Sequence, residues 1–552
     1  MKSEACNTNT SVVRRSIRYF RGHRLKLFCG VLIALAGTVV GVGSGYTLKI
    51  LVDDILLAGD IRWIWPIQLL FLLFVFTSSF LGVYSTKIFS GICARILDKI
   101  RGGIFAHVLK ADYLAFNQLS AGAIHTTINY GVDNLEGLIS RGIPEAASSI
   151  IGIAIYLSAM FVIDWRLALL SLPVYPVLIL INGYMQKKLH AIQAVNQRNR
   201  ANVNNDIEEG IKCRDNIWAF NLFDYMNQRF GASVGALHKN HVRFKVIVDI
   251  LNRTSWMFIM VPYQAILYGI GGSWFILNGN PTIGTLLIFA NFTNSLIGPV
   301  MSLVNFNSSV SSARAGYERI DELTALPRQK NRVYDACAAL DGAVIEFNGL
   351  RYQYGSGGEA VFDEFSRRFK QNSATILWGP SGCGKSTLLK LIYGFLYPQE
   401  KGQIRLADMG DSWLRDGDWA YLPQNPYLFN ITLRENFQIV NPEIEEEGMW
   451  RLLDTVNLKR KFVNLENGLD YELVNSDKNL SGGEHKRLCL AVFLAYNANI
   501  LLFDEPTANL DYENSRIISE AFRRVKARGD KTLIIATHDQ NLKSISDELL
   551  EL

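Results

Sequence analysis

Charged residues are scarce in this chain. Asp, Glu, Lys and Arg make up only 19% of its 552 residues, and 49% of the residues are hydrophobic. A soluble protein of this length carries about a quarter charged residues. The deficit lies almost entirely in the first 325 residues, and the remainder has an ordinary soluble composition. A single soluble core is therefore excluded, and the sequence predicts a membrane part followed by a soluble part.

Long basic runs and closely spaced cysteines are also missing. The formal net charge is +5 without a continuous basic stretch, so we expect no nucleic-acid partner. The seven cysteines show no C-x-x-C spacing, which argues against a disulfide framework and against a zinc site. The first apolar run follows several arginines and lacks a clear cleavage site. We interpret it as a retained membrane span rather than as a signal peptide.

Six apolar stretches are long enough to cross a bilayer, which takes about 20 residues each. Lipid offers no hydrogen-bond partner to an open backbone, so each stretch is expected to be a helix. The two long gaps, at about 84–142 and 186–255, are rich in Lys and Arg and are therefore placed in the cytoplasm, together with the C-terminal half. The predicted spans are Leu25–Leu48, Ile64–Val83, Ile143–Ile163, Leu167–Met185, Trp256–Leu277 and Ile283–Val304.

The chain is expected to divide into four segments. A cytoplasmic N-terminal segment (1–24) precedes an all-α, six-helix transmembrane domain (25–325), and a linker (326–340) leads into a soluble domain (341–552). In the soluble domain, short β-branched runs alternate with helical patterns, which is typical of an α/β fold. We therefore expect a multi-pass protein of the cytoplasmic membrane, in contact with lipid, that carries a cytoplasmic α/β domain.

A glycine-rich loop follows the strand-like run 375–378 and opens a helical pattern. Its residues are Gly379, Pro380, Ser381, Gly382, Cys383, Gly384, Lys385, Ser386 and Thr387. This is a P-loop in its required context of strand, loop and helix. The glycines let backbone N–H groups face one phosphate cluster, Lys385 adds charge at the β- and γ-phosphates, and the Ser386 hydroxyl is a ligand for Mg²⁺.

Two carboxylates follow a second apolar strand, at 500–503. Asp504 is expected to hold Mg²⁺ through water, and Glu505 to polarise the attacking water. A strand that ends in a solvated acidic turn is the alternative. The position of this pair more than a hundred residues after a P-loop disfavours that alternative.

A Ser-Gly-Gly turn lies between these elements, within Leu480-Ser481-Gly482-Gly483-Glu484, and two further motifs, 509–511 and 537–539, follow the carboxylates. In this order, the motifs resemble those of the ABC ATPase family over about residues 341–549. The preceding six spans resemble, with weaker motifs, the transmembrane half of ABC exporters.

The resemblance implies ATP and Mg²⁺ as cofactors, and it implies a role for each matched residue. Tyr354 is expected to stack on adenine, Gln424 to sense Mg²⁺, and Asp511 to lie at the nucleotide site. Glu505 matches the catalytic carboxylate, and His538 the histidine that contacts the γ-phosphate, although a histidine here could also simply cap a strand. Ser481, Gly482 and Gly483 are expected to bind ATP that is held by the opposite subunit.

That last role also has a physical reason. The Ser-Gly-Gly turn opens a helix, and a helix N-terminus attracts anions. The chain already offers the P-loop for one phosphate cluster. Two ATP molecules between two chains best explain the second phosphate-binding turn. The expected partner is therefore a second half-transporter, most simply the same chain, with a heterodimer as the alternative.

Several features of the membrane half are candidates for coupling and for a substrate cavity. Residues 116–122 and 216–221 resemble the two coupling-helix regions of exporters. The Ser-Gly-Gly turn at 480–484 is called the signature turn below. Exporters usually carry a glutamate in the loop that precedes it. Asn475 occupies that position here, so the contacts between this loop and the coupling helices are expected to differ. The last span carries polar residues largely on one face, which fits cavity lining and interhelical hydrogen bonding equally well. These polar residues are Asn291, Asn294, Ser295, Ser302, Asn305 and Ser309, and the aromatic candidates are Trp256, Tyr263, Tyr268 and Trp274.

The function that these observations predict is ATP-driven export by alternating access. A small peptide, bacteriocin-like or otherwise amphipathic, is the expected substrate, and lipid or drug export is the alternative. A siderophore-type importer on the exporter fold is also open. An ATP-gated channel or regulator with little turnover belongs to another class, and the intact Glu505, His538 and signature turn disfavour it.

Overall fold

The computed structural model describes residues 2–57, 59–119, 121–329, 335–337, 340, 342–355, 358–400, 403–407, 419–465, 467–473 and 480–552. Within these ranges the chain forms two compact units. One comprises residues 1–109 and 119–325 and is called the transmembrane unit below. The other comprises residues 110–118 and 326–552 and is called the ATPase unit. The loop that contains Asn475 lies outside the described residues.

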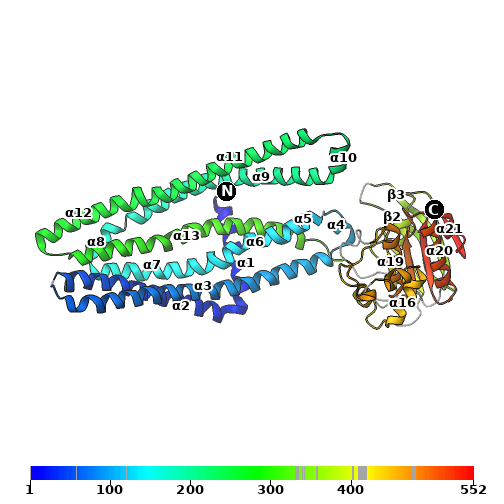
Figure 1. Cartoon of the computed structure of the whole chain (residues 1–552), viewed down its shortest axis with the longest axis horizontal. Coiled ribbons are helices and arrows are strands. Elements are labelled where there is room, and N and C mark those ends of the chain that lie inside the picture. Colours follow the sequence, from blue (N-terminus) through cyan, green and yellow to red (C-terminus); the bar gives the residue numbers. More distant parts are fainter. Residues whose placement is uncertain are drawn as a thin grey trace. The chain divides into compact units, whose positions relative to one another are not determined.

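The transmembrane unit is built from helices alone (Figure 1). Within the described residues, six of its helical stretches are long and apolar enough to cross a membrane, and they match the six predicted spans to within one residue or extend beyond them. The helices are α1 (Lys2–Tyr19), η1 (Phe20–His23), α2 (Arg24–Ile50), η2 (Leu51–Leu56), η3 (Ile61–Trp63), α3 (Ile64–Leu109), α5 (Ala121–Thr126), η4 (Thr127–Gly131), α6 (Val132–Glu136), η5 (Gly137–Gly142), α7 (Ile143–Ile163), α8 (Trp165–Ser171), α9 (Val174–Lys212), α10 (Arg214–Ala219), α11 (Phe223–Ser255), η6 (Trp256–Met260), α12 (Val261–Asn278) and α13 (Ile283–Thr324).

Four of these helices are much longer than a bilayer is thick. The helix α3 has 46 residues, α13 has 42, α9 has 39 and α11 has 33. About 20 residues already cross the hydrocarbon, so each helix continues well beyond it. The predicted long cytoplasmic gaps are therefore largely helical. The helices α9 and α11 lie side by side and meet at the short α10 (Figure 1).

Small residues let the long helices approach closely. A Cβ added at Gly316 of α13 would lie 2.5 Å from the carbonyl oxygen of Gly131, so backbone meets backbone there. Near the N-terminus, Arg15 forms a two-pronged ion pair with Asp321 at 2.7 Å and lies 4.3 Å from the ring centre of Tyr317. These contacts attach α1 to the last turns of α13.

The ATPase unit contains two sheets. Five parallel strands form one sheet in the order β6-β7-β8-β4-β9, and four strands form the other in the order β1-β5-β2-β3. In chain order the strands are β1 (Asp335–Cys337), β2 (Ala343–Gln353), β3 (Ala360–Lys370), β4 (Ala374–Trp378), β5 (Ile404–Ala407), β6 (Trp419–Leu422), β7 (Ile500–Asp504), β8 (Thr532–Thr537) and β9 (Glu548–Glu551).

Helices pack around the parallel sheet, whose central strands β4, β7 and β8 are almost wholly buried. Strands buried on both faces read as continuous apolar runs, as 500–503 does. The helices are α4 (Tyr113–Asn117), α14 (Lys385–Tyr393), α15 (Leu433–Val440), α16 (Glu446–Thr455), α17 (Lys459–Val463), η7 (Gly468–Asp470), α19 (Gly482–Leu494), α20 (Tyr512–Lys526) and α21 (Gln540–Lys543).

The helix α4 belongs to the ATPase unit, although it lies between two membrane spans in the sequence. Tyr113 stacks on Phe395 with ring centres 4.8 Å apart, and the Lys390 ammonium lies 5.5 Å from the centre of the Tyr113 ring. Gln329 accepts a hydrogen bond from the Tyr113 N–H at 2.8 Å and donates one to the Gly394 carbonyl at 2.8 Å. The first residues of the predicted linker therefore hold α4 in place rather than form a free tether.

We expect Gly316→Ala to lower the free energy of unfolding by about 1–3 kcal/mol, because the added methyl would meet the Gly131 carbonyl, which cannot rotate away. The matched control is Gly298→Ala in the same helix, where an added Cβ meets nothing within 4 Å. Thermal unfolding of both variants in detergent checks this. Equal midpoints for the two variants would show that the approach of α13 to η4 is not tight.

Candidate functional site

Three parallel strands end at one edge of the ATPase sheet. Their register pairs Trp378 of β4 with Thr537 of β8, and Asp504 of β7 with Ala536 of β8. The P-loop follows β4, Glu505 follows β7 and His538 follows β8. Ligands of open α/β sheets bind outside the carboxyl ends of the strands. The fold therefore brings the three sequence motifs to one place.

The P-loop wraps around the ammonium group of its own lysine. Lys385 is 4% exposed, and its Nζ donates to the carbonyl oxygens of Gly379 at 2.8 Å and Pro380 at 2.9 Å. Gly384 has a φ of 104°, in the left-handed region, and an added Cβ would meet Phe362 and Val361 at 2.9 Å. Only glycine fits this position. The residues before the lysine form an open rim, with Pro380, Ser381 and Gly382 exposed and Cys383 half-buried, while Thr387 is buried on α14.

Asp504 is buried at 3% exposure, and hydroxyl groups satisfy both of its oxygens. Ser386 donates to one oxygen at 2.7 Å and Tyr421 donates to the other at 2.9 Å. Burial, together with the negative charge of Asp504, raises the pKa of Tyr421. The tyrosine therefore stays a proton donor to the carboxylate. A hydroxyl beside a carboxylate is a pair of hard oxygen donors, which suits Mg²⁺.

Glu505 is the second of the two carboxylates, and three side chains of the site lie close to it. Its side chain is 12% exposed and receives a hydrogen bond from Gln424 at 3.0 Å. Lys385 Nζ and His538 Nδ1 lie 3.9 Å and 3.5 Å from its Oε1. The backbone of Glu505 has a φ of 45°, which is rare for residues other than glycine and is characteristic of functional sites.

His538 differs from this buried group because its side chain is 60% exposed. The ring follows β8, and one of its nitrogens lies beside the Glu505 carboxylate.

Tyr354 presents an aromatic ring beside the phosphate loop. Its hydroxyl lies 3.0 Å from that of Thr387, and its ring packs edge-on against Tyr352 with centres 5.2 Å apart. The residue is 43% exposed, so part of the ring lies open to solvent. Base stacking on such a ring needs no particular hydrogen bond.

The Ser-Gly-Gly turn forms a separate structure. Ser481 caps α19 and accepts from the Glu484 N–H at 3.2 Å, while Glu484 accepts from the Ser481 N–H at 2.9 Å and from Lys461 at 2.6 Å. Gly483 lies against Asn514, where an added Cβ would be 2.6 Å from the amide nitrogen. Within the described ranges, none of the hydrogen bonds of the turn reaches the P-loop.

Asp511 caps a helix rather than facing the P-loop. Its carboxylate accepts from the Asn514 N–H at 2.8 Å at the start of α20. Because Asn514 also lies against Gly483, Asp511 supports the signature turn from the adjacent helix.

Two contacts of the site were not predicted from the sequence. The Tyr421 hydroxyl binds Asp504, and Lys486 donates to the Ala508 carbonyl behind the second carboxylate. Burial lowers the pKa of Lys486. Tyr421 lies three residues before Gln424, in the strand β6, which pairs with β7. Because Asp504 ends β7, this strand pairing could have indicated that Tyr421 lies near Asp504.

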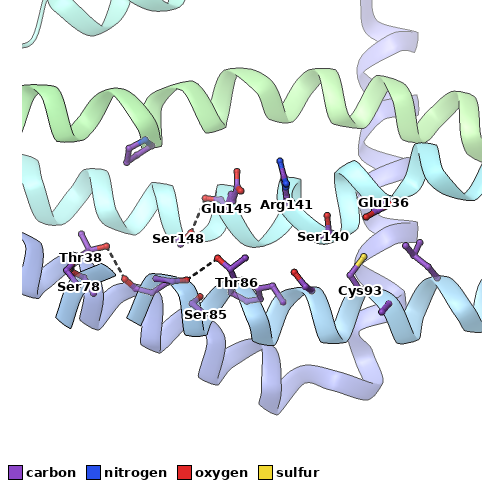
Figure 2. Close-up of a pocket in the computed structure, with 18 of the residues that line it drawn as sticks. Thr38, Ser78, Ser85, Thr86, Cys93, Glu136, Ser140, Arg141, Glu145 and Ser148 are labelled. Carbon is purple, nitrogen blue, oxygen red and sulfur yellow. Dashed lines mark hydrogen bonds between the residues drawn. The ribbon is translucent and has the colours of Figure 1, made fainter. Parts of the chain in front are cut away.

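The transmembrane unit contains a polar cavity of about 660 Å³, lined by residues of α2, α3, α6, η5, α7 and α13 (Figure 2). Eight hydroxyl side chains from Ser and Thr line it, together with five charged residues. The hydroxyl residues are Thr38, Ser78, Ser85, Thr86, Ser90, Ser140, Ser148 and Ser295, and the charged ones are Asp98, Arg101, Glu136, Arg141 and Glu145.

The charged residues are only partly paired. Arg101 binds Asp133 at 2.8 Å, whereas Glu145 accepts a hydrogen bond from Ser302 at 3.3 Å and has no ion-pair partner within the described ranges. Among the described residues, Glu136 and Arg141 have no ion-pair partner. Ionisable groups near the membrane that lack partners are characteristic of ligand or ion pathways.

The last span contributes less to this cavity than its polar face predicted. Of the polar candidates, Ser295 lines the cavity and Ser302 reaches Glu145. Asn291, Asn294, Asn305 and Ser309 are not among the lining residues.

The aromatic candidates also lie elsewhere. Tyr263 is buried and binds the hydroxyls of Ser171 and Thr293 at 2.8 Å and 2.9 Å, which is interhelical bonding. Tyr268 and Trp274 do not line the cavity, and the side chain of Trp256 lies outside the described residues.

Short helices occupy both regions that were expected to couple the two halves. They are α4 and α10. At the tip of α10, Trp218 is 65% and Phe220 is 72% exposed. Phe223 packs edge-on against Trp218, with ring centres 5.2 Å apart. The tip therefore presents apolar surface that its own unit leaves open.

Comparison with known proteins agrees with this architecture. Residues 27–300 match the model of the ABC transporter transmembrane region, and residues 362–508 match that of the ABC transporter ATPase. An ATP-dependent lipid A-core flippase of Desulfotalea psychrophila is 24% identical over 98% of this chain and 94% of its own length. A multidrug resistance-like ATP-binding protein, MdlB of Buchnera aphidicola, is 23% identical over 96% of this chain and 90% of its own.

A solved structure has the same fold. A bacterial Atm1-family ABC exporter with ATP bound superposes with a TM-score of 0.74, at 20% identity, over 96% of this chain and 93% of that one. The predicted membrane α-helical domain fused to an α/β ATPase domain is therefore confirmed.

We expect Glu505→Gln to retain ATP binding while lowering the rate of hydrolysis by at least about a hundredfold, because the amide keeps the shape but cannot polarise water. Nucleotide binding and phosphate release are measured on the same preparation. The control, Glu520→Gln, changes an exposed glutamate on α20 and should leave both quantities unchanged. Hydrolysis at the wild-type rate in the Glu505 variant would remove this residue from the reaction.

Proposed function

Because this chain belongs to the ABC transporters and joins an exporter-type membrane half to one ATPase half, we propose that two copies form a pump for a small peptide or another amphipathic compound. The chain is an ATP-driven exporter of the cytoplasmic membrane with its ATPase unit in the cytoplasm. The proposal concerns the assembly, the chemistry of the site and the substrate.

The separation of the two phosphate-binding turns is the observation that supports the assembly. The P-loop, Asp504 and Glu505 share contacts with one another, whereas the turn at Ser481 is bonded to Lys461 and Glu484. A helix N-terminus attracts anions, so the turn needs a phosphate that its own P-loop does not bring. A second copy, related by a two-fold axis, supplies it. The open apolar tip of α10 provides further surface for that copy to cover.

The residues at the strand edge fit ATP with Mg²⁺. Ser386, Asp504 and Gln424 would hold the ion, which would neutralise charge on the phosphates. Lys385 and the backbone N–H groups of the loop bind the phosphates, and Tyr354 stacks on the base. Glu505 accepts a hydrogen bond from the attacking water and orients it, while His538 contacts the γ-phosphate from the open side. ATP thereby joins the two ATPase units, and hydrolysis releases them.

The cavity supports a polar, amphipathic substrate. Its charged residues lie near the cytoplasmic ends of the spans, and its hydroxyls continue inward to Ser78 and Ser295. A neutral apolar compound would leave Glu145 and Arg141 without oppositely charged partners, whereas a zwitterionic peptide matches both. A volume of about 660 Å³ is that of sites for drug-sized ligands. Lipid or drug export remains the second candidate, since relatives are named as a lipid A-core flippase and as a multidrug resistance-like protein.

Mixing two inactive variants tests the shared site. Lys385→Ala disables every P-loop in its own dimer, and Ser481→Asn disables every signature turn while keeping a residue that caps helices. A mixed dimer regains one intact site. We expect up to about a quarter of the wild-type ATPase rate, since about half of the dimers are mixed and each has one site. No recovery in verified mixed dimers would contradict a site built from two chains.

Substrate class is tested by ATPase stimulation and vesicle transport with peptides, lipids and dyes. We expect stimulation by a zwitterionic peptide, and the double variant Glu145→Gln/Arg141→Gln should raise the half-saturating concentration at least about tenfold, because charged hydrogen bonds are lost. The control Glu318→Gln/Arg319→Gln removes the same charges from the cytoplasmic part of α13. Stimulation by dyes or lipids alone, unaffected by the cavity variant, would favour the second candidate.

A further inference from the structure

A second groove lies between α2 and α3, apart from the polar cavity. It has a volume of about 410 Å³ and contains three cationic residues and no carboxylate. The other lining residues are apolar, tyrosine or glycine. The full lining is Leu25, Lys26, Cys29, Tyr84, Lys87, Ile88, Gly91, Ile92 and Arg95.

The packing of the two helices sets the height of the three cations. Ser85 donates to the Gly30 carbonyl at 2.9 Å and Ser78 to the Gly37 carbonyl at 2.8 Å, so α2 and α3 run antiparallel in a fixed register. In that register Lys26 is level with residue 89. Lys87 then lies about 3 Å further into the membrane and Arg95 about 9 Å further toward the cytoplasm, at 1.5 Å per residue. The three cations therefore occupy a short stretch of the groove.

That stretch coincides with the cytoplasmic surface of the bilayer. The helix α3 and its predicted span both begin at Ile64, and Lys87 comes about 35 Å later along the helix, at 1.5 Å per residue. The hydrocarbon core is about 30 Å thick. Lys26 lies in the first turn of α2, at the same end. The cations thus lie at the height of lipid headgroups, and Tyr84 and Ile88 continue the groove toward the acyl chains.

The charges in the groove are unpaired. Lys26, Lys87 and Arg95 are exposed, and none has a carboxylate partner among the described residues. The nearest acidic residue on α3 is Asp98, which lines the other cavity and lies 3.9 Å from Arg101. Three unpaired cations side by side repel one another, so an anion held between them is favoured.

We propose that this groove binds an anionic phospholipid of the cytoplasmic leaflet. Its phosphate lies between Lys26, Lys87 and Arg95, and one acyl chain follows the apolar surface past Ile88 and Tyr84. Anionic lipids are attracted to basic residues at this depth, and basic pockets between membrane helices suit their headgroups. The site is separate from the transport cavity and does not depend on which substrate is exported.

Gly91 offers a way to fill the groove without removing a charge. An added Cβ there meets nothing within 4 Å, so Gly91→Leu extends into the space the lipid would occupy. Gly102→Leu is the matched control, because it lies on the same helix, is exposed and has the same open surroundings. A second test is the triple variant Lys26→Gln/Lys87→Gln/Arg95→Gln. Its control, Arg200→Gln/Arg214→Gln/Arg319→Gln, removes equal charge from exposed cytoplasmic positions.

The experiment is native mass spectrometry of the full-length dimer titrated with phosphatidylglycerol or with phosphatidylcholine of the same acyl chains. We expect one phosphatidylglycerol per chain to bind at least about tenfold more tightly than phosphatidylcholine, given the attraction of three cations. Gly91→Leu and the triple variant should lose this preference, and both controls should keep it. Thermal midpoints of all variants establish that they are folded.

Two results would overturn the proposal. One is equal affinity of the wild-type protein for both lipids, which would also follow if a second copy of the chain covered the groove. The other is unchanged preference in both the Gly91 and the triple variant. Because no transport is measured, a failure here leaves the proposed export function standing, and a failure of export leaves this lipid site standing.

Discussion

The ATPase unit depends on the burial of two adjacent carboxylates at the end of one strand. Negative charge out of water is costly unless it is hydrogen-bonded or paired. Asp504 meets that condition through two hydroxyl donors, and Glu505 through Gln424 and the nearby Lys385. These partners come from different strands, loops and helices of the unit. The start of α14, the strand β6 and the Gln424 segment must therefore all be in place for the two acids to be tolerated together.

The proposed assembly of two chains accounts for two features of this chain. The signature turn, stabilised by a capping box at the start of α19, makes none of its hydrogen bonds to the P-loop within the described residues. In the transmembrane unit, α10 exposes large aromatic side chains. In the assembly that we propose, a second copy covers both.

Local patterns in the sequence predicted most of the fold. The six spans were predictable because hydrophobic length is a local property, and the strand preceding the P-loop because its apolar residues are contiguous. The lengths of α3 and α9 were not, since their polar cytoplasmic parts carry no hydropathy signal. Apart from Ser295, the polar cavity residues were missed because they come from several helices, and contacts such as those of Ser78 and Ser85 with α2 fix the register between helices. The roles assigned to Tyr354, His538 and Ser481 stay predictions, although the structure places the first two beside the P-loop.

The nine residues 110–118 lie within the ATPase unit, although the spans on either side of them belong to the transmembrane unit. The polypeptide therefore passes between the units three times, after residues 109, 118 and 325. Two of the three crossings flank a helix whose Tyr113 is stacked on Phe395. Cutting the chain after residue 325 would accordingly separate Phe395 from Tyr113, so the ATPase unit is not a module that begins at Leu326.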